Sequence, residues 1–243
     1  HKLLVRGGYI RQLHSGHYIL LPLAHRARKK IIAVIEQEMD SIGGQQVQMP
    51  TLQPASTWQQ SGRWESMGEI MFRLEDRHGT EAALGVTAEE IFAIVGSEIT
   101  SYKQLPQMWY QIHTKYRDEA RPKSGLLRVR EFTMKDAYSF HLDHECLEKT
   151  YSTMFKTYSS IFERIGLKYR SVLADTGNIG GSTSHEFHVL AESGEDSIAY
   201  NESGSFAANL EMVPILKPLQ SIALKKSGDF KEIKTPNQHT MQE

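Results

Sequence analysis

Two long segments carry apolar residues at three- and four-residue steps, the spacing of an amphipathic helix. The first runs from Pro22 to Ile42; Pro22 suits a helix start, and Gly43-Gly44 suit its end. Its apolar residues are Ala24, Ala27, Ile31, Val34, Ile35, Met39 and Ile42. The second segment follows Asp143, a good helix cap, and ends at Gly166. We expect both helices to pack against a core.

Alternation of apolar and polar residues predicts strands between and after these helices. The expected strands cover 46–49, 70–75, 80–86, 167–174, 185–192 and 197–200. Residues 1–23 are expected to be extended with a turn, and 54–62 to form a short helix closed by Gly62. Asp76-Arg77-His78-Gly79 is predicted to form a hairpin loop between two of the strands.

A further helix is predicted to begin at Thr87-Ala88-Glu89-Glu90. Thr87 and Glu90 have the spacing of a capping box, in which each side chain bonds the other residue's backbone. Glu89 has no part in such a cap. On the pattern alone it either complements the helix dipole or faces a ligand, and the two interpretations remain open.

The stretch from Tyr110 to His141 predicts a long hairpin with Pro122 and Gly125 at its tip. Residues of equal parity share one face of a strand. One face of the first strand therefore carries Gln111, His113, Lys115, Arg117 and Glu119, and one face of the return strand carries Arg128, Arg130, Phe132, Met134 and Asp136. A face with this many charges is costly to bury without partners. A solvated surface is the alternative, but the set as a whole favours the floor of a polar ligand site.

Composition narrows the class of protein only slightly. The 243 residues are 40% hydrophobic and 23% charged, with a net charge of −1, as in ordinary globular proteins. This charge gives no overall attraction to nucleic acid or membrane. The single cysteine, Cys146, excludes an intrachain disulfide, and the histidines lack metal-site spacing, so we expect no structural metal. No apolar run reaches the length of a membrane span, so no membrane partner is expected.

Several segments in order resemble one family. KYRDEARPKSGLLRVREFTMKDAYSFH resembles motif 2 of class II aminoacyl-tRNA synthetases, in the form found in bacterial and mitochondrial prolyl-tRNA synthetases. Residues 22–50 resemble motif 1, the dimer element of that class, and WQQSGRW, RLEDRHGTEAALGVTAEE, SYKQLP and GGSTSHEF are similar to further segments. The resemblance covers nearly all of 1–210. It implies an α+β fold, the class II catalytic fold, in which helices flank an antiparallel β-sheet.

The resemblance also implies a reaction and its substrates. Proline attacks the α-phosphate of ATP, which normally arrives with Mg²⁺, and the prolyl group of the resulting adenylate passes to tRNA(Pro). Arg117 is the implied catalytic residue, holding the α-phosphate and the proline carboxylate. By the same resemblance, Glu119 would accept from the adenine amino group. Arg128 would reach the γ-phosphate, and Phe132 would stack on the adenine ring. The implied proline pocket comprises Thr87, Glu89, Arg117, Asp136, Tyr138 and His185, and so it assigns Glu89 to the ligand.

Three departures from the family pattern bear on this expectation. The chain has Val86 and Ala88 where the family usually has Pro and His, and Val129 where it usually has Gly. Nothing in the chain resembles motif 3, which carries an ATP-binding arginine in this class. Residues 211–243 read as a linker or as the start of an inserted editing-type domain. We therefore expect an incomplete, truncated catalytic portion that is inactive or nearly so by itself.

The resemblance leaves two rival functions to weigh. A non-catalytic paralogue that binds tRNA or a partner protein would explain the missing motif 3, although Arg117, Glu119, Phe132, Thr87 and Glu89 are all retained. A class II synthetase for threonine or serine is disfavoured by the TAEE and SHEF segments. The expected assembly is a homodimer formed through residues 22–50. The expected compartment is the bacterial cytoplasm, favoured by the apparent insertion, or the mitochondrial matrix.

Overall fold

Helices and strands fall into two units in the computed structural model, which describes residues 1–174, 183–192, 194, 196–201, 206–210 and 213. The first unit is His1–Tyr169 and the second is Arg170–Glu243. The division falls inside the predicted 1–210 domain. The predicted boundary at 210/211 stays a prediction, because almost all of 211–243 lies outside the described residues.

The first unit begins with a helix and a hairpin where an extended segment was expected. Helix α1 (Lys2–Arg6) precedes strands β1 (Ile10–His14) and β2 (His17–Leu20). The expectation for 1–23 was therefore wrong at its start, where Leu3, Leu4 and Val5 offer too short an apolar pattern to reveal one helical turn. Gly7 closes the helix by donating its backbone N–H to the carbonyl of Leu3.

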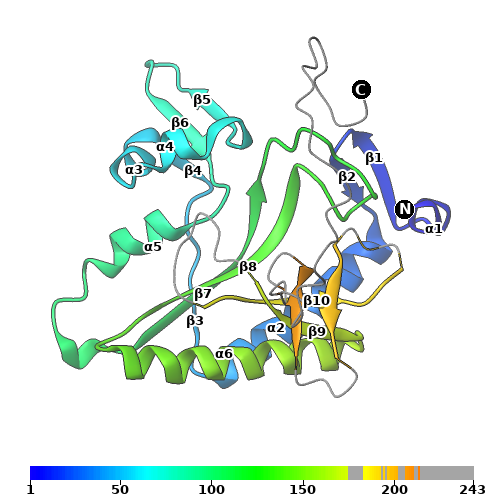
Figure 1. Cartoon of the computed structure of the whole chain (residues 1–243). Helices are drawn as coiled ribbons and strands as arrows, with labels where there is room; N and C mark the ends of the chain where they lie inside the picture. The colour runs from blue at the N-terminus through cyan, green and yellow to red at the C-terminus, as the bar shows by residue number, and fades with distance from the viewer. Residues whose placement is uncertain (175–182, 193, 195, 202–205, 211–212, 214–243) are drawn as a thin grey trace, which may run out of the picture. The chain divides into compact units, whose positions relative to one another are not determined.

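Both long predicted helices form. Helix α2 (Pro22–Ser41) has Pro22 in its first turn, and Gly43 follows it with a φ of +80°, a left-handed conformation that suits glycine. Helix α6 (His144–Ile165) is capped by Asp143, whose carboxylate accepts from the backbone N–H of Cys146 at 2.8 Å. Helix α6 contacts both α2 and the strand β8 (Glu131–Phe140), and so holds the long hairpin from one side (Figure 1).

The strands of the first unit form three small sheets within the described residues. One is β1–β2, and one is β4 (Leu52–Pro54), β6 (Glu81–Leu84) and β5 (Arg73–Glu75), antiparallel throughout. The third joins β8 and β7 (Gln107–Tyr116) to β3 (Gln45–Gln46), which runs parallel to β7. β3 is shorter than the expected strand over 46–49, because the Met49 N–H donates to the Gln111 side chain at 3.0 Å rather than to a backbone carbonyl.

Short helices connect the strands of these sheets along the chain. They are α3 (Ala55–Gln60), α4 (Arg63–Ser66), α5 (Glu89–Gly96) and the single 3₁₀ turns η1 (Gly68–Ile70) and η2 (Tyr102–Gln104). The predicted loop between β5 and β6 forms, and the Asp76 carboxylate accepts there from the backbone N–H groups of His78 and Thr80. The helix predicted over 54–62 also forms.

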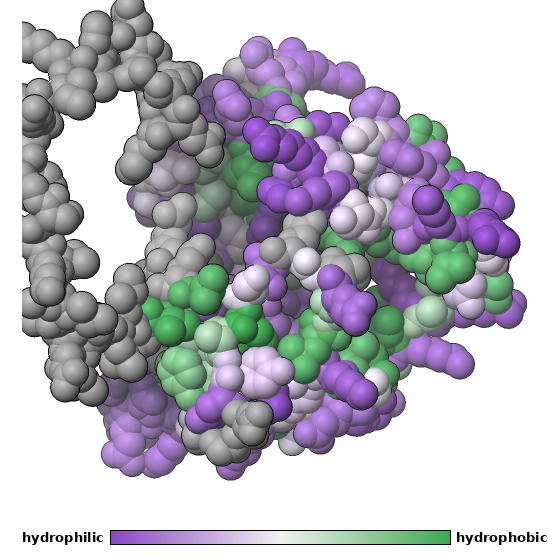
Figure 2. Space-filling view, turned by 45° about the vertical axis from the view of Figure 1, so that its right-hand side comes forward, coloured by the Kyte–Doolittle hydropathy of each residue, from purple (hydrophilic) through white to green (hydrophobic). Residues whose placement is uncertain are grey.

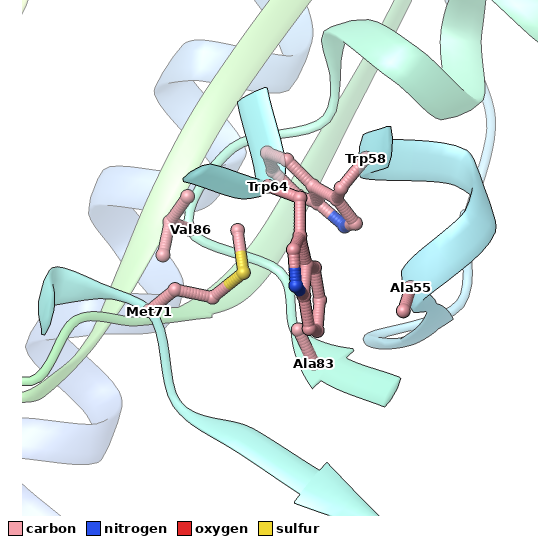
Figure 3. Packing of buried hydrophobic residues seen from close by; sticks show 6 residues of the cluster. All are labelled: Ala55, Trp58, Trp64, Met71, Ala83 and Val86. Atoms are coloured by element: carbon pink, nitrogen blue, oxygen red, sulfur yellow. The ribbon is translucent and has the colours of Figure 1, made fainter. Parts of the chain in front are cut away.

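Two clusters of buried apolar residues support the segment from α3 to α5. In the first, Trp58 and Trp64 pack with Met71 and Val86 between short elements (Figure 3). In the second, Phe92 of α5 packs against Met49 and Ala88, and its ring centroid lies 4.2 Å from that of Tyr138. Each indole or phenyl group buries a large apolar area, so these clusters fix the start of α5 relative to β8.

The second unit contains a four-stranded sheet in its described part, in the order β10 (His185–Val189), β9 (Tyr169–Leu173), β12 (Ala207–Asn209) and β11 (Ile198–Tyr200). The first three strands in sequence were expected, and β12 was missed because three small residues carry no alternation. β12 runs parallel to β9 and antiparallel to β11. The Gly180-Gly181 pair lies outside the described residues.

The face shown in Figure 2 carries both hydrophilic and hydrophobic residues. Large apolar side chains exposed in the structure include Leu3, Leu13 and Leu127. None of the helices in the described part of the chain is both long and apolar enough to cross a bilayer.

The cap at Asp143 gives a test of the fold. Asp143→Ala removes the acceptor for the Cys146 N–H, and we expect it to lower the free energy of unfolding by about 1 kcal/mol. Asp143→Asn keeps an acceptor and should change it by much less. Urea-induced unfolding followed by circular dichroism measures both; equal losses in the two variants would show that the cap bond is not the cause.

Candidate functional site

The register of the long hairpin joins the two predicted polar faces into one. β7 and β8 pair antiparallel with Gln111 opposite Asp136, His113 opposite Met134 and Lys115 opposite Phe132. The same register continues past the strand ends, where the Arg117 N–H donates to the Arg130 carbonyl at 2.9 Å. Directly opposite residues of an antiparallel pair lie on the same side. The predicted face is therefore continuous across both strands.

Three of the residues at the centre of this face form a buried polar cluster. The Lys115 ammonium lies 3.2 Å from Asp136 Oδ1, and the side chains are 2% and 8% exposed. Gln111, 1% exposed, donates to Asp136 Oδ2 at 3.0 Å. Burial lowers the pKa of Lys115, while the charge and hydrogen bond of Asp136 act in the opposite direction. The centre of the predicted face is therefore a buried ion pair and does not form the open floor of a ligand site.

Asp136 also connects the hairpin to the start of α5. The Tyr138 hydroxyl donates to Asp136 Oδ2 at 3.1 Å and accepts from the Ala88 N–H at 3.1 Å. The Thr87 hydroxyl lies 3.4 Å from the Tyr138 hydroxyl oxygen and donates to Glu89 Oε2 at 2.5 Å. Burial raises the pKa of Tyr138, so the hydroxyl keeps its proton and can donate. Thr87, Glu89, Asp136 and Tyr138 therefore belong to one network.

The predicted capping box at Thr87 does not form. Ala88 is the N-cap of α5 and makes no side-chain cap bond. Thr87 instead donates to Glu89, and Glu90 turns away from the backbone, accepts from the Ser61 hydroxyl at 2.9 Å and pairs with Arg63 at 3.0 Å. The spacing alone could not reveal this, because the partners come from a segment about 27 residues earlier.

Arg117 lies next to this network and carries a positive charge that no carboxylate in the described residues pairs with. Its guanidinium stands 5.3 Å from the ring centroid of Phe132 and donates to the Val86 carbonyl at 3.4 Å. Burial lowers its pKa, and the charge of Glu89 opposes that shift. A half-buried guanidinium without a carboxylate partner is suited to an anionic ligand.

Glu119 and Arg128, for which separate roles were expected, pair with each other. Arg128 Nε lies 2.8 Å from Glu119 Oε2, and the Arg121 N–H donates to Glu119 Oε1 at 2.9 Å. The hydrogen bond from Arg128, followed by the one from Arg121, lowers the pKa of Glu119. Their nucleotide contacts remain predictions, and binding through both residues requires this ion pair to open.

The three residues that depart from the family pattern, Val86, Ala88 and Val129, lie in two kinds of environment. Val86 is 2% exposed and belongs to the tryptophan cluster, and Ala88 is 1% exposed and packs with Phe92. Their side chains therefore act in packing, while the backbone groups of the same residues contact Arg117 and Tyr138. Val129 lies half-buried in the loop before β8.

One residue of the implied proline pocket, His185, belongs to the second unit. His185 opens β10 in the second unit, and its place in the proline pocket stays a prediction. Glu186, next to it, accepts from Asn209 at 2.8 Å and pairs with His188 at 2.7 Å. No group of three potential metal-ligating side chains was found among the described residues.

Sequence reasoning missed Arg63. Its Nη1 lies 3.0 Å from Glu89 Oε2 and 3.0 Å from Glu90 Oε1. A cavity of about 330 Å³ adjoins the Glu90 side of this cluster, lined by Thr57, Gln60, Ser61, Glu90, Ala93, Ile94 and Ser97. The available signal was the WQQSGRW segment, which was recognised only as part of a resemblance.

The buried Lys115–Asp136 pair gives a second test. Lys115→Met or Asp136→Asn alone leaves one buried charge without its partner, which typically costs about 3–5 kcal/mol. The double variant removes both charges and keeps an acceptor for Gln111. We expect it to be less destabilised than the sum of the single variants. A double-mutant cycle by chemical denaturation measures this coupling, and additive losses would contradict a direct ion pair.

Comparisons with known proteins agree with the fold and the motifs. The sequence profile described as the tRNA synthetase class II core domain (G, H, P, S and T) matches residues 72–239, past the predicted boundary at 210. The chain is 51% identical to the proline--tRNA ligase of Geobacillus kaustophilus (strain HTA426) and 52% identical to that of Moorella thermoacetica (strain ATCC 39073 / JCM 9320). All of the chain is covered in both, but only 43% and 42% of those relatives, so it spans less than half their length.

Solved structures show the same fold at low identity. The Giardia lamblia prolyl-tRNA synthetase in complex with prolyl-adenylate matches 71% of this chain and 36% of its own, with a TM-score of 0.66 and 23% identity. The Cryptosporidium parvum prolyl-tRNA synthetase complexed with L-proline and AMP matches 76% and 38%, with a TM-score of 0.68 and 18% identity. By its fold and its matching profile, the chain belongs to the class II tRNA synthetase core family.

Proposed function

We propose that this chain is the part of a proline–tRNA ligase that binds proline and ATP for the formation of prolyl-adenylate. The observation that carries the proposal is the network of Thr87, Glu89, Asp136 and Tyr138 next to Arg117. It presents a carboxylate and a guanidinium close together, and a free amino acid is a zwitterion. The proline--tRNA ligases that are about half identical to the chain support the choice of amino acid.

The proposed reaction demands mainly positioning and charge stabilisation from the protein. The proline carboxylate attacks the α-phosphate of ATP, pyrophosphate leaves, and the prolyl group then passes to the terminal ribose of tRNA(Pro). Glu89 and Thr87 would receive the imino group, while Arg117 would hold the carboxylate and the α-phosphate. A fixed positive charge at a developing phosphoryl centre lowers the barrier without any covalent step on the protein.

The adenine half of the site rests on the other hairpin residues. Phe132 already stacks against the Arg117 guanidinium and would offer its ring to adenine. Arg128 would move from Glu119 to the γ-phosphate, which leaves the Glu119 carboxylate to accept from the adenine amino group. Mg²⁺ would arrive with ATP, since such sites hold it largely through the phosphates. His185 would complete the proline pocket.

The proposal extends to assembly and location. Residues 22–50 include α2 and β3 and would form the dimer contact, as the resemblance to motif 1 implies. The proposed compartment is the bacterial cytoplasm, with the mitochondrial matrix as the alternative.

Proline-dependent exchange of pyrophosphate into ATP tests the activity directly. We expect the intact protein to catalyse exchange with proline and not with threonine or serine. Exchange driven by threonine or serine would assign the pocket to another amino acid. A folded intact protein that shows no exchange would favour a non-catalytic paralogue that binds tRNA or a partner.

Arg117 provides the matched mutational test. Arg117→Ala should lower kcat for exchange by about 10²–10³-fold, the usual loss when a charge-stabilising donor is removed. Arg117→Lys should recover only part of it, because a lysine lacks the planar two-pronged geometry. Arg77→Ala, in the exposed β5–β6 loop, is the control. Near-normal exchange in Arg117→Ala would refute the assignment.

A further inference from the structure

Arg63 is fixed at the start of α4 by several contacts. Gly62 precedes it as the N-cap, with a φ of +74° that favours glycine, and so the chain can turn sharply there. The guanidinium lies 5.5 Å from the ring centroid of the fully buried Trp58. From this position Nη1 reaches Glu89 Oε2 and Glu90 Oε1, each at 3.0 Å. The Arg63 side chain is only 19% exposed.

The two carboxylate oxygens of Glu89 differ in their hydrogen-bond contacts. Oε2 accepts from both the Thr87 hydroxyl, at 2.5 Å, and Arg63, at 3.0 Å. Within the described part of the chain, Oε1 makes no such contact. The Glu89 side chain is 32% exposed. Arg63 and Thr87 thus hold one oxygen and leave the other to accept from a ligand.

An arginine in this place also creates a difficulty. Its formal charge of +1 would cancel that of Glu89 and weaken any attraction for a cationic group. Glu90 resolves this, because the three side chains together carry a formal charge of −1. Glu90 is 5% exposed and accepts from the Ser61 hydroxyl at 2.9 Å, so its Oε1 is held against Arg63.

Burial of the Glu90 carboxylate leaves one of its oxygens without a hydrogen-bond donor in the described part of the chain, and the packing around it does not explain why this group is there. Its Oε2 is buried and makes no hydrogen bond among the described residues. A buried carboxylate oxygen without a donor lowers stability, and groups of this kind are often retained for function.

We propose that Arg63 is a positioning residue for the proline pocket, and that Glu90 neutralises it so that Glu89 keeps its charge for the imino group. The inference rests on the proposed function, in which Glu89 receives that group. Arg63 touches no substrate in this account; it acts by orienting the Glu89 carboxylate.

A purely structural role of Arg63 and Glu90 predicts a different pattern of ligand binding in the variants. If Arg63 and Glu90 only join α4 to α5, their loss should weaken binding of every ligand of the pocket alike. Two ligands separate the cases: L-proline, and tetrahydrofuran-2-carboxylate, in which an ether oxygen replaces the imino group. Both offer a carboxylate to Arg117, but only proline offers a cationic N–H to Glu89.

The experiment measures the Kd of both ligands for the intact protein and its variants by titration calorimetry or NMR. In Glu90→Gln we expect the Kd of proline to rise about tenfold, the scale of a charge-assisted hydrogen bond, and that of the analogue to stay within about twofold. The KM for proline should rise with kcat nearly unchanged. Glu98→Gln, an exposed acid just past α5, is the control.

A second pair of variants, at Arg63, tests the inference even if the Glu90→Gln protein does not fold. Arg63→Met should weaken proline binding selectively by about tenfold through the misplaced Glu89, and Arg63→Lys, which keeps the charge, should restore most of it. Arg77→Met is the matched control. Equal losses for both ligands, or unchanged binding in both Glu90→Gln and Arg63→Met, would overturn the inference while leaving the proposed function standing. A wild-type protein that binds no proline, or does not prefer it to the analogue, would overturn both.

Discussion

The buried ion pair between Lys115 and Asp136 connects the long hairpin to the rest of the site. Because Lys115 neutralises Asp136, the carboxylate can stay buried and accept from Gln111 and the Tyr138 hydroxyl. Tyr138 in turn fixes the backbone of Ala88. Ala88 is the N-cap of the helix that begins with Glu89, so the position of this carboxylate depends on a charge pair in the β7–β8 hairpin. Removing one partner of such a pair would leave the other charge buried without compensation.

The remaining charges are arranged in two opposite groups. Glu89, Glu90 and Arg63 together carry one negative charge, while Arg117 has no carboxylate partner among the described residues. A ligand with a cationic and an anionic end complements both groups at once.

The short elements between β4 and α5 position residues of both groups. The tryptophans that pack there place Arg63, and Val86 in the same cluster supplies the carbonyl that Arg117 contacts.

Sequence patterns predicted the elements whose signals are local. The Asp143 cap, Gly43, Gly79 and Gly166 each mark an end or a turn through the conformation of one or two residues. Parity also placed Gln111, Lys115 and Asp136 on one face, as the register shows. Helix α1 and strand β12 were missed because their local patterns are too short, and two other failures depended on distant partners. The Thr87–Glu90 box was mistaken because Ser61 and Arg63 offer Glu90 better partners, and the 46–49 strand was cut short by the side chain of Gln111.

Under the proposed function, the pocket holds prolyl-adenylate between Glu89 and Arg117. A crystal structure of the intact protein with a hydrolysis-resistant sulfamoyl analogue of prolyl-adenylate tests it most directly. The account predicts the imino nitrogen at about 3 Å from Glu89 Oε1, the sulfamoyl group on the Arg117 guanidinium and adenine on Phe132. An analogue bound with its pyrrolidine ring away from Glu89, or with no contact to Arg117, would contradict it.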